Sequence, residues 1–262
     1  MTLRGMAIAA IAFALFAGAA QAGAGERVSV NTPRGVSQPF EFFATDTPKA
    51  GLVLFVGGDG SLGSNAKNFL TRIAGDLAGN GFLVALVDMP SDKQKANAKF
   101  RISKKHAGDI AAVIKYLKGT SDVPVWLVGT SMGTFSAASV AIKKQKLISG
   151  LVLTSSVTRS KPGHKYTAGF PDGVLGLNLQ KLKKPVLIIY HLIYHRADVC
   201  SITPPADGEK IKSKLKQSPR VELVMVDGGK PAKSDPCKAL SAHGFFGVEW
   251  KAVDKIESFI AP

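Results

Sequence analysis

Six short, mainly apolar runs recur along the chain, at residues 52–56, 82–88, 123–128, 147–153, 185–190 and 221–226. A strand that is apolar on both faces belongs in a sheet covered on both sides, as parallel sheets are. Helical patterns alternate with these runs, for example at 69–78 and 134–144. Repeated strand–helix units of this kind predict a doubly wound α/β fold with a mostly parallel sheet.

Other segments complete this organisation. Residues 28–30 and 40–43 flank the turn-forming stretch 31–35, which predicts an N-terminal antiparallel hairpin. Further helices are expected at 206–215 and 248–260. Residues 155–184 break the rhythm and predict either a long loop or a small cap. No linker divides the chain, so residues 23–262 are expected to form one domain.

The first 22 residues have the pattern of a secretory signal peptide. Arg4 precedes an apolar run at 6–16, and Ala20-Gln21-Ala22 forms a small-x-small cleavage site before Gly23. The apolar run is shorter than the roughly 20 residues that a membrane-spanning helix needs. The mature protein is therefore expected to be exported, periplasmic or secreted, and not inserted in a membrane after cleavage.

The chain is basic, with 34 Lys and Arg against 19 Asp and Glu, a formal net charge of +15. The basic residues are scattered, and no run of five or six occurs. No aromatic residues alternate with basic ones in the manner of a nucleic-acid-binding module. The charge therefore indicates a solvated basic surface, and no nucleic-acid partner is expected.

Cys200 and Cys237 are the only cysteines. In an oxidising compartment thiols pair, so one disulfide is predicted, unless the two are buried free thiols. His191 and His195 are four residues apart, but they lie around a strand end without an evident third ligand, so no metal site is predicted.

Residues 129–133 read Gly-Thr-Ser-Met-Gly, a match to the pattern G-x-S-x-G. An apolar strand precedes the motif, and a helix rich in small residues follows it. At such a junction a sharp turn exposes the serine hydroxyl at the carboxyl edge of the sheet, and its neighbours must be small. The position predicts Ser131 as a catalytic nucleophile.

A serine hydroxyl needs a base to activate it. His243 follows the sixth central strand and precedes the last helix, where the chain returns over the sheet edge, so it is the predicted base. His106 lies on the apolar face of a helix and is expected to be a core residue with satisfied hydrogen bonds. His164, in the irregular segment, and the pair His191 and His195, after the fifth strand, are rival candidates for the base.

A carboxylate should orient that base, and it should lie between serine and histidine in the chain. Asp198 follows the fifth strand and is the predicted acid, although residues 191–194 lengthen the approach to it. The rival carboxylates are Asp172, Asp207, Asp227 and Asp235. If both predictions hold, the Asp198 and His243 loops meet, and Cys200 and Cys237 come within bridging distance.

At this point the chain resembles the α/β-hydrolase family, and within it a group of small exported bacterial hydrolases. The resemblance rests on residues 129–133, on His195 to Cys200 with Thr203-Pro204, on Asp235-Pro236-Cys237 followed by His243-Gly244-Phe245, and on the glycine-rich turn after Val56. It covers nearly all of the mature chain. It implies the α/β-hydrolase fold, a Ser131–His243–Asp198 triad and no cofactor.

The turn after Val56 differs from that of many esterases of this family. It reads Gly57-Gly58-Asp59-Gly60, where those esterases have His-Gly. An oxyanion hole needs backbone N–H groups rather than a side chain, so the expected donors are Met132 with Gly58 or Asp59.

Two classes of function follow. The first is a serine hydrolase that cleaves an ester, thioester or amide of a small acyl substrate through an acyl-enzyme on Ser131. The second is a periplasmic binding or carrier protein that keeps the fold without turnover. The basic charge and Asp59 in the turn favour the second, and the filled triad positions favour the first.

Overall fold

The computed structural model describes residues 25–161, 163–193 and 195–261. The predicted signal peptide, residues 1–22, lies outside the described residues. Among those described, no helix is long and apolar enough to cross a lipid bilayer.

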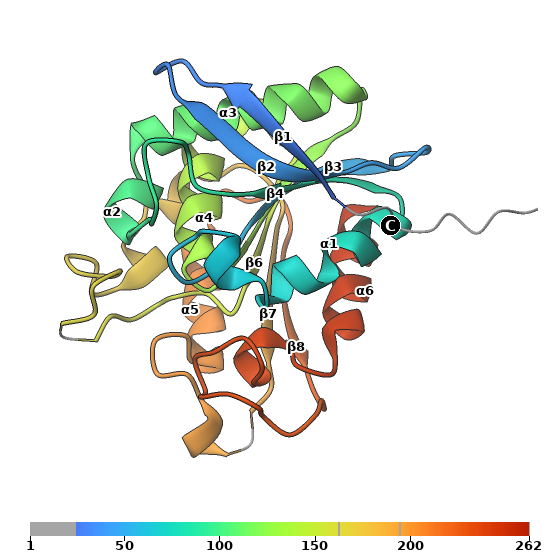
Figure 1. Cartoon of the computed structure of the whole chain (residues 1–262). Helices are drawn as coiled ribbons and strands as arrows, with labels where there is room; N and C mark the ends of the chain where they lie inside the picture. Colours follow the sequence, from blue (N-terminus) through green and yellow to red (C-terminus); the bar gives the residue numbers. More distant parts are fainter. Residues whose placement is uncertain (1–24, 162, 194, 262) are drawn as a thin grey trace, which may run out of the picture.

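Eight strands form a single sheet in the order β1-β2-β4-β3-β5-β6-β7-β8 (Figure 1). The first two pair antiparallel, β2 pairs antiparallel with β4, and the other neighbours are parallel, which confirms the predicted fold class and hairpin. The bounds of the strands are β1 Glu26–Asn31, β2 Ser37–Phe43, β3 Ala50–Phe55, β4 Phe82–Val87, β5 Val125–Thr130, β6 Gly150–Thr154, β7 Val186–His191 and β8 Val221–Val226.

Helices cover both faces of this sheet. The core on one face includes buried side chains of α3 (Lys104–Thr120), α4 (Gly133–Lys143) and α5 (Gly208–Lys214), while α2 (Ala98–Arg101) contacts α3 and α4. The core on the other face includes those of α1 (Phe69–Gly79) and α6 (Glu249–Ile260). This two-sided cover explains why every residue of β3, β4, β5, β6 and β7 is buried, and why these strands read as continuous apolar runs.

Two details differ from the sequence predictions, the start of one strand and the hydrogen bonding of His106. The strand expected at 147–153 begins only at Gly150, because residues Gln145–Leu147 form a 3₁₀ turn. The described part of 155–184 contains 3₁₀ turns at Gly173–Gly176 and Leu179–Lys181. His106 is buried as expected, but neither ring nitrogen has a hydrogen-bond partner among the described residues. Burial lowers the pKa of His106 to about 3, so it is a neutral core residue.

The strand order sets the location of a site. From β3 the chain adds β4 on one side and then β5 on the other, so the connections diverge between β3 and β5. In open α/β sheets, ligands bind at this switch point, beyond the carboxyl ends of the strands. Phe55 pairs with Gly129 there, which places the turn after β3 beside the Gly-Thr-Ser-Met-Gly turn after β5.

Candidate active site

Ser131 lies in a strained turn between β5 and α4. Its φ of 52° is in the left-handed region, where a non-glycine residue costs on the order of 1–3 kcal/mol. A Cβ at Gly129 would lie 2.7 Å from the Gly133 carbonyl oxygen, and a Cβ at Gly133 would lie 1.9 Å from the Phe55 carbonyl oxygen. Both motif glycines are therefore required by close packing, for the reason that the sequence pattern suggested.

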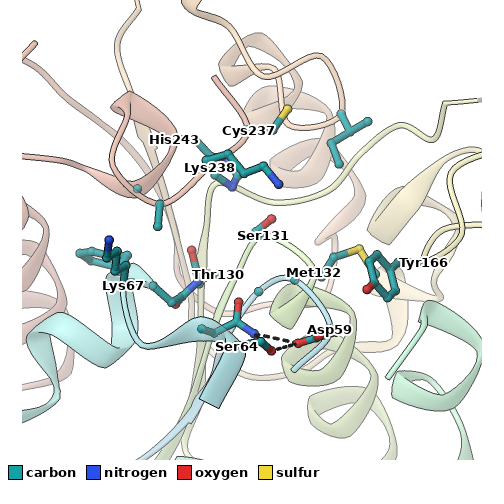
Figure 2. Close-up of a pocket in the computed structure, with 18 of the residues that line it drawn as sticks. Asp59, Ser64, Lys67, Thr130, Ser131, Met132, Tyr166, Cys237, Lys238 and His243 are labelled. Carbon is teal, nitrogen blue, oxygen red and sulfur yellow. Dashed lines mark hydrogen bonds between the residues drawn. The ribbon is translucent and has the colours of Figure 1, made fainter. Parts of the chain in front are cut away.

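His243 faces the same cavity as Ser131. The cavity has a volume of about 380 Å³ and lies between the turn after β3, the start of α4 and the histidine loop, residues 235–247 (Figure 2). His243 itself is buried in the 3₁₀ turn Ala242–Gly244. Among the described residues, His164 is the one other histidine that lines this cavity. The structure thus places the predicted nucleophile and the predicted base on the same cavity, and among the described residues no hydrogen bond joins them.

Several contacts outside the sequence motifs hold His243 in place. The Ser155 hydroxyl donates to the His243 carbonyl oxygen at 2.9 Å, and Arg72 donates to the Gly244 carbonyl oxygen at 2.6 Å. A Cβ at Gly244 would lie 2.0 Å from the Ala239 carbonyl oxygen, so the turn needs glycine. Neither Ser155 nor Arg72 belongs to a recognisable motif, and sequence analysis did not find them.

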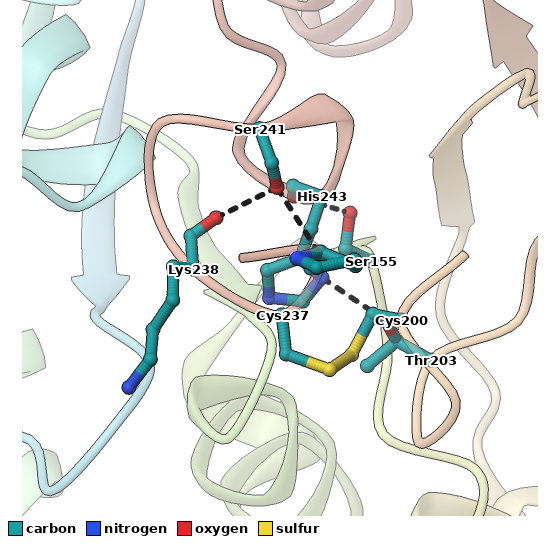
Figure 3. The surroundings of a disulfide bond; sticks show 8 residues. Ser155, Cys200, Thr203, Cys237, Lys238, Ser241 and His243 are labelled. Carbon is teal, nitrogen blue, oxygen red and sulfur yellow. Dashed lines mark hydrogen bonds between the residues drawn. A yellow bond between two sulfur atoms is a disulfide. The ribbon is translucent and has the colours of Figure 1, made fainter. Parts of the chain in front are cut away.

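The partner of the His243 imidazole is a hydroxyl. Thr203 Oγ1 lies 3.0 Å from His243 Nδ1 (Figure 3), the position at which a carboxylate was predicted. Burial lowers the pKa of His243 to about 4, because no neighbouring charge offsets the cost of burying the imidazolium.

The structure does not bring Asp198 to His243. Asp198 is exposed in the 3₁₀ turn Arg196–Asp198, and it lines a second cavity of about 270 Å³ together with Ser241 and Ala242 of the histidine loop. The backbone N–H of Leu192 still pairs with the Val226 carbonyl oxygen, so β7 continues past His191 before the chain turns towards Asp198. The lengthened approach noted in the sequence accounts for this separation.

The rival carboxylates have other positions. Burial opposes the ionisation of Asp207, but hydrogen bonds from Arg159, Lys210 and Thr158 outweigh it and lower its pKa to about 2. Asp227 is exposed and pairs with Lys251. Asp172 and Asp235 are exposed. Within the described residues, no carboxylate is hydrogen-bonded to His243.

The predicted disulfide between Cys200 and Cys237 is present, with a Cα–Cα distance of 4.6 Å (Figure 3). It joins the segment that carries Asp198 and Thr203 to the histidine loop, although the Asp198 carboxylate itself stays away from the imidazole. The bridge closes a span of 37 residues, which the chain-entropy model values at about 3–4 kcal/mol.

Opening this bridge is expected to lower the melting temperature by about 10 °C. It should also lower activity, because Thr203 and His243 lose their common tether. Thermal unfolding with and without a reductant measures the effect, and the Cys200→Ser/Cys237→Ser double variant is the control that a reductant should not change further. An unaltered melting temperature in that variant would show that the bridge contributes no stability.

The predicted oxyanion donors surround Ser131. Among the described residues, the backbone N–H groups of Met132, Gly58 and Asp59 have no backbone acceptor, and all three residues line the cavity. The Asp59 carboxylate turns away towards residues 61–65, where it accepts hydrogen bonds from Ser64 Oγ at 2.6 Å and Asn65 Nδ2 at 2.9 Å (Figure 2). These neutral donors therefore hold the carboxylate on the side of residues 61–65.

Arg101 supports this turn from behind. Its buried guanidinium donates through Nη2 to the carbonyl oxygens of Val56, Gly57 and Gly58, at 3.3, 3.3 and 3.4 Å. In a trans peptide the N–H points opposite to the C=O, so these bonds fix the directions of the Gly58 and Asp59 N–H groups. Burial lowers the pKa of Arg101 to about 10, which leaves it charged at neutral pH. Sequence analysis did not single out Arg101.

The arrangement provides a serine, an imidazole and backbone donors around one cavity. In the part of the chain that the structure describes, no group of three or more His, Cys, Asp or Glu side chains is arranged to hold a metal ion.

Comparisons with known proteins agree with the fold. A family model described as serine aminopeptidase, S33, matches residues 47–206. No curated protein matches significantly. An esterase from Pyrococcus furiosus has a similar structure, with a TM-score of 0.66 and 16% identity over 95% of both chains.

Two further structures resemble the chain. A predicted CIB-like hydrolase from Thermoplasma acidophilum has a TM-score of 0.60 at 15% identity, covering 90% of this chain and 99% of the other. An α/β serine hydrolase without lid from Xanthomonas campestris has a TM-score of 0.56 at 13% identity, covering 90% and 94%. These likenesses concern the fold, whereas the family model spans more than half of the sequence. The chain therefore belongs to the serine aminopeptidase (S33) family of α/β hydrolases.

Proposed function

We propose that this hydrolase is an exported serine hydrolase that cleaves a carboxylic ester, or a related thioester or amide, through an acyl-enzyme on Ser131. The observation that carries the proposal is the strained Ser131 turn facing a buried histidine across one cavity. The signal-peptide pattern of residues 1–22 and the Cys200–Cys237 bridge support export.

In the proposed reaction, Ser131 Oγ attacks the carbonyl carbon while His243 Nε2 takes its proton. The N–H groups of Met132, Gly58 and Asp59 stabilise the oxyanion, and the positive end of α4 adds to this field. The protonated His243 then gives its proton to the leaving group. Water attacks the acyl-enzyme by the same route and releases the acid.

Thr203 has a defined part in this proposal. With Nδ1 protonated and donating to Thr203 Oγ1, the imidazole presents its unprotonated Nε2 to Ser131. Unlike a carboxylate, a hydroxyl can also donate, so it favours this tautomer less strongly, and it brings no charge to stabilise the imidazolium.

Substitutions at Thr203 and Asp198 test which of the two residues orients the His243 imidazole. Thr203→Val, which keeps the shape but removes the hydroxyl, is expected to lower kcat about tenfold or more, and Thr203→Ser should restore it. Asp198→Asn is expected to cost less than about threefold, because its carboxylate does not reach the imidazole. If Asp198→Asn instead lowers kcat on the order of 10⁴-fold, as loss of a triad acid does, Asp198 is the orienting residue after all.

The second candidate function is that of a binding or carrier protein. The observation that favours it is the hydroxyl at His243 Nδ1 in place of a carboxylate. Hydrolysis of 4-nitrophenyl acetate by the purified exported protein distinguishes the two functions. A hydrolase should release a burst of nitrophenol in proportion to enzyme, followed by steady turnover. A binding protein should show neither.

A further inference from the structure

The cavity around Ser131 has a positively charged rim. Lys67, just before α1, and Lys238, in the histidine loop, are both exposed and line the cavity (Figure 2). Within the described chain neither ammonium group forms an ion pair. Two unpaired cations thus border the space in which a substrate must lie.

Arg72 forms hydrogen bonds to the backbone of both segments that carry these lysines. Arg72 donates to the Lys67 carbonyl oxygen and to that of Ala239, the neighbour of Lys238, and it pairs with Glu249 at 2.7 Å. Cys237, on the other side of Lys238, is in the disulfide. The two lysines therefore project from anchored segments rather than from free loops.

The one carboxylate that lines the cavity in the described chain forms no ion pair with either lysine. Asp59 is the only acidic residue of the described chain that lines the cavity, and its Oδ1 accepts hydrogen bonds from Ser64 Oγ, Asn65 Nδ2 and the Ser61 N–H. Arg101 lies on the other side of the same turn. With Lys67, Lys238 and the nearby Arg101 against Asp59, the charge around the cavity is positive, and the formal net charge of the protein is +15.

We propose that the natural substrate is an ester carrying its own anionic group, a carboxylate or a phosphate, which binds Lys67 and Lys238 while its carbonyl lies at Ser131. This inference rests on the proposed function. The cavity, at about 380 Å³, fits a small molecule, and Phe69, Tyr166 and Ile202 provide apolar surface for its carbon chain. The anion supplies the counter-charge that the lysines lack.

The test compares two esters of equal chain length, mono-4-nitrophenyl glutarate, which is anionic, and 4-nitrophenyl pentanoate, which is neutral. At low ionic strength the anionic ester is expected to have a kcat/KM roughly tenfold higher, and this preference should shrink as salt is added. Lys67→Gln and Lys238→Gln should each lower the glutarate-to-pentanoate ratio about two- to fivefold, mainly through KM. Lys118→Gln, an exposed lysine of α3 outside the cavity, is the matched control and should leave both rates unchanged.

Inhibition separates the two anions. Inorganic phosphate and free glutarate are each tested as inhibitors of 4-nitrophenyl pentanoate hydrolysis. Stronger inhibition by phosphate would indicate that the anionic group of the substrate is a phosphate, and stronger inhibition by glutarate would indicate a carboxylate. Equal kcat/KM for the two esters, or a ratio unchanged in both lysine variants, would overturn the inference.

Failure of the proposed function would look different, because neither ester would be hydrolysed. Calorimetric titration with glutarate and with phosphate then decides the charge inference by itself. Binding that weakens in both lysine variants would support it, and no binding of either anion would overturn it.

Discussion

The Ser131→Ala protein is expected to lose about 10³-fold or more in kcat/KM towards short acyl esters while staying folded. Alanine removes the attacking oxygen, and what remains is the rate that the oxyanion donors and binding provide alone. The fold should tolerate the change, because the Ser131 hydroxyl has no hydrogen bond within the described residues and alanine keeps the same Cβ in the turn. Steady-state kinetics and thermal unfolding measure the two effects.

Ser258→Ala is the matched control for this variant. Ser258 is exposed on α6, where its hydroxyl contacts the Asp254 carbonyl oxygen. Both variants should unfold at the temperature of the wild type, and only Ser131→Ala should be inactive. Turnover within tenfold of the wild type in Ser131→Ala would remove the nucleophile assignment.

Replacing His243 by Gln is expected to lower kcat to a similar degree. Because the serine and its base act as one unit, the Ser131→Ala/His243→Gln double variant should be hardly slower than either single variant. Losses that multiply in the double variant would mean that the two residues act in separate steps.

The pH dependence of the wild type tests the surroundings of His243 more finely. The imidazole must be neutral to take the Ser131 proton, so kcat/KM should be flat at neutral pH and fall as His243 becomes protonated. With a pKa of about 4, set by burial without a neighbouring carboxylate, kcat/KM should be halved only near pH 4. A carboxylate at Nδ1 would stabilise the imidazolium and raise that pKa. An acid limb near pH 6.5 or above would therefore contradict the Thr203 pairing and favour Asp198.

The fold could be predicted because its main determinants are local. β3 to β7 are apolar on both faces because helices cover both sides of the sheet, and the helical patterns between these runs point to that arrangement. Gly129 and Gly133 are visible in the sequence because only glycine fits those contacts. His243 follows from chain order, since the chain must cross the sheet edge after β8 and before α6.

The rest of the site depends on contacts that leave no pattern. Chain order and the family resemblance both predict Asp198, but the extra residues after β7 set the course of an exposed loop, and sequence does not define that course. Thr203 is an ordinary hydroxyl until the disulfide brings its segment beside His243. Arg101 comes from a four-residue helix, and its role depends on burial against a turn some 45 residues earlier in the chain.

The acyl-enzyme on Ser131 is the central claim, and labelling with a fluorophosphonate probe tests it most directly. The probe phosphonylates a serine that a neighbouring base activates, so it reports the site without knowledge of the substrate. We expect the wild type to take up one label, located by peptide mass spectrometry at Ser131, and the Ser131→Ala protein to take up none. A label at another residue, a label that persists in Ser131→Ala, or a wild type that stays unlabelled would contradict the assignment.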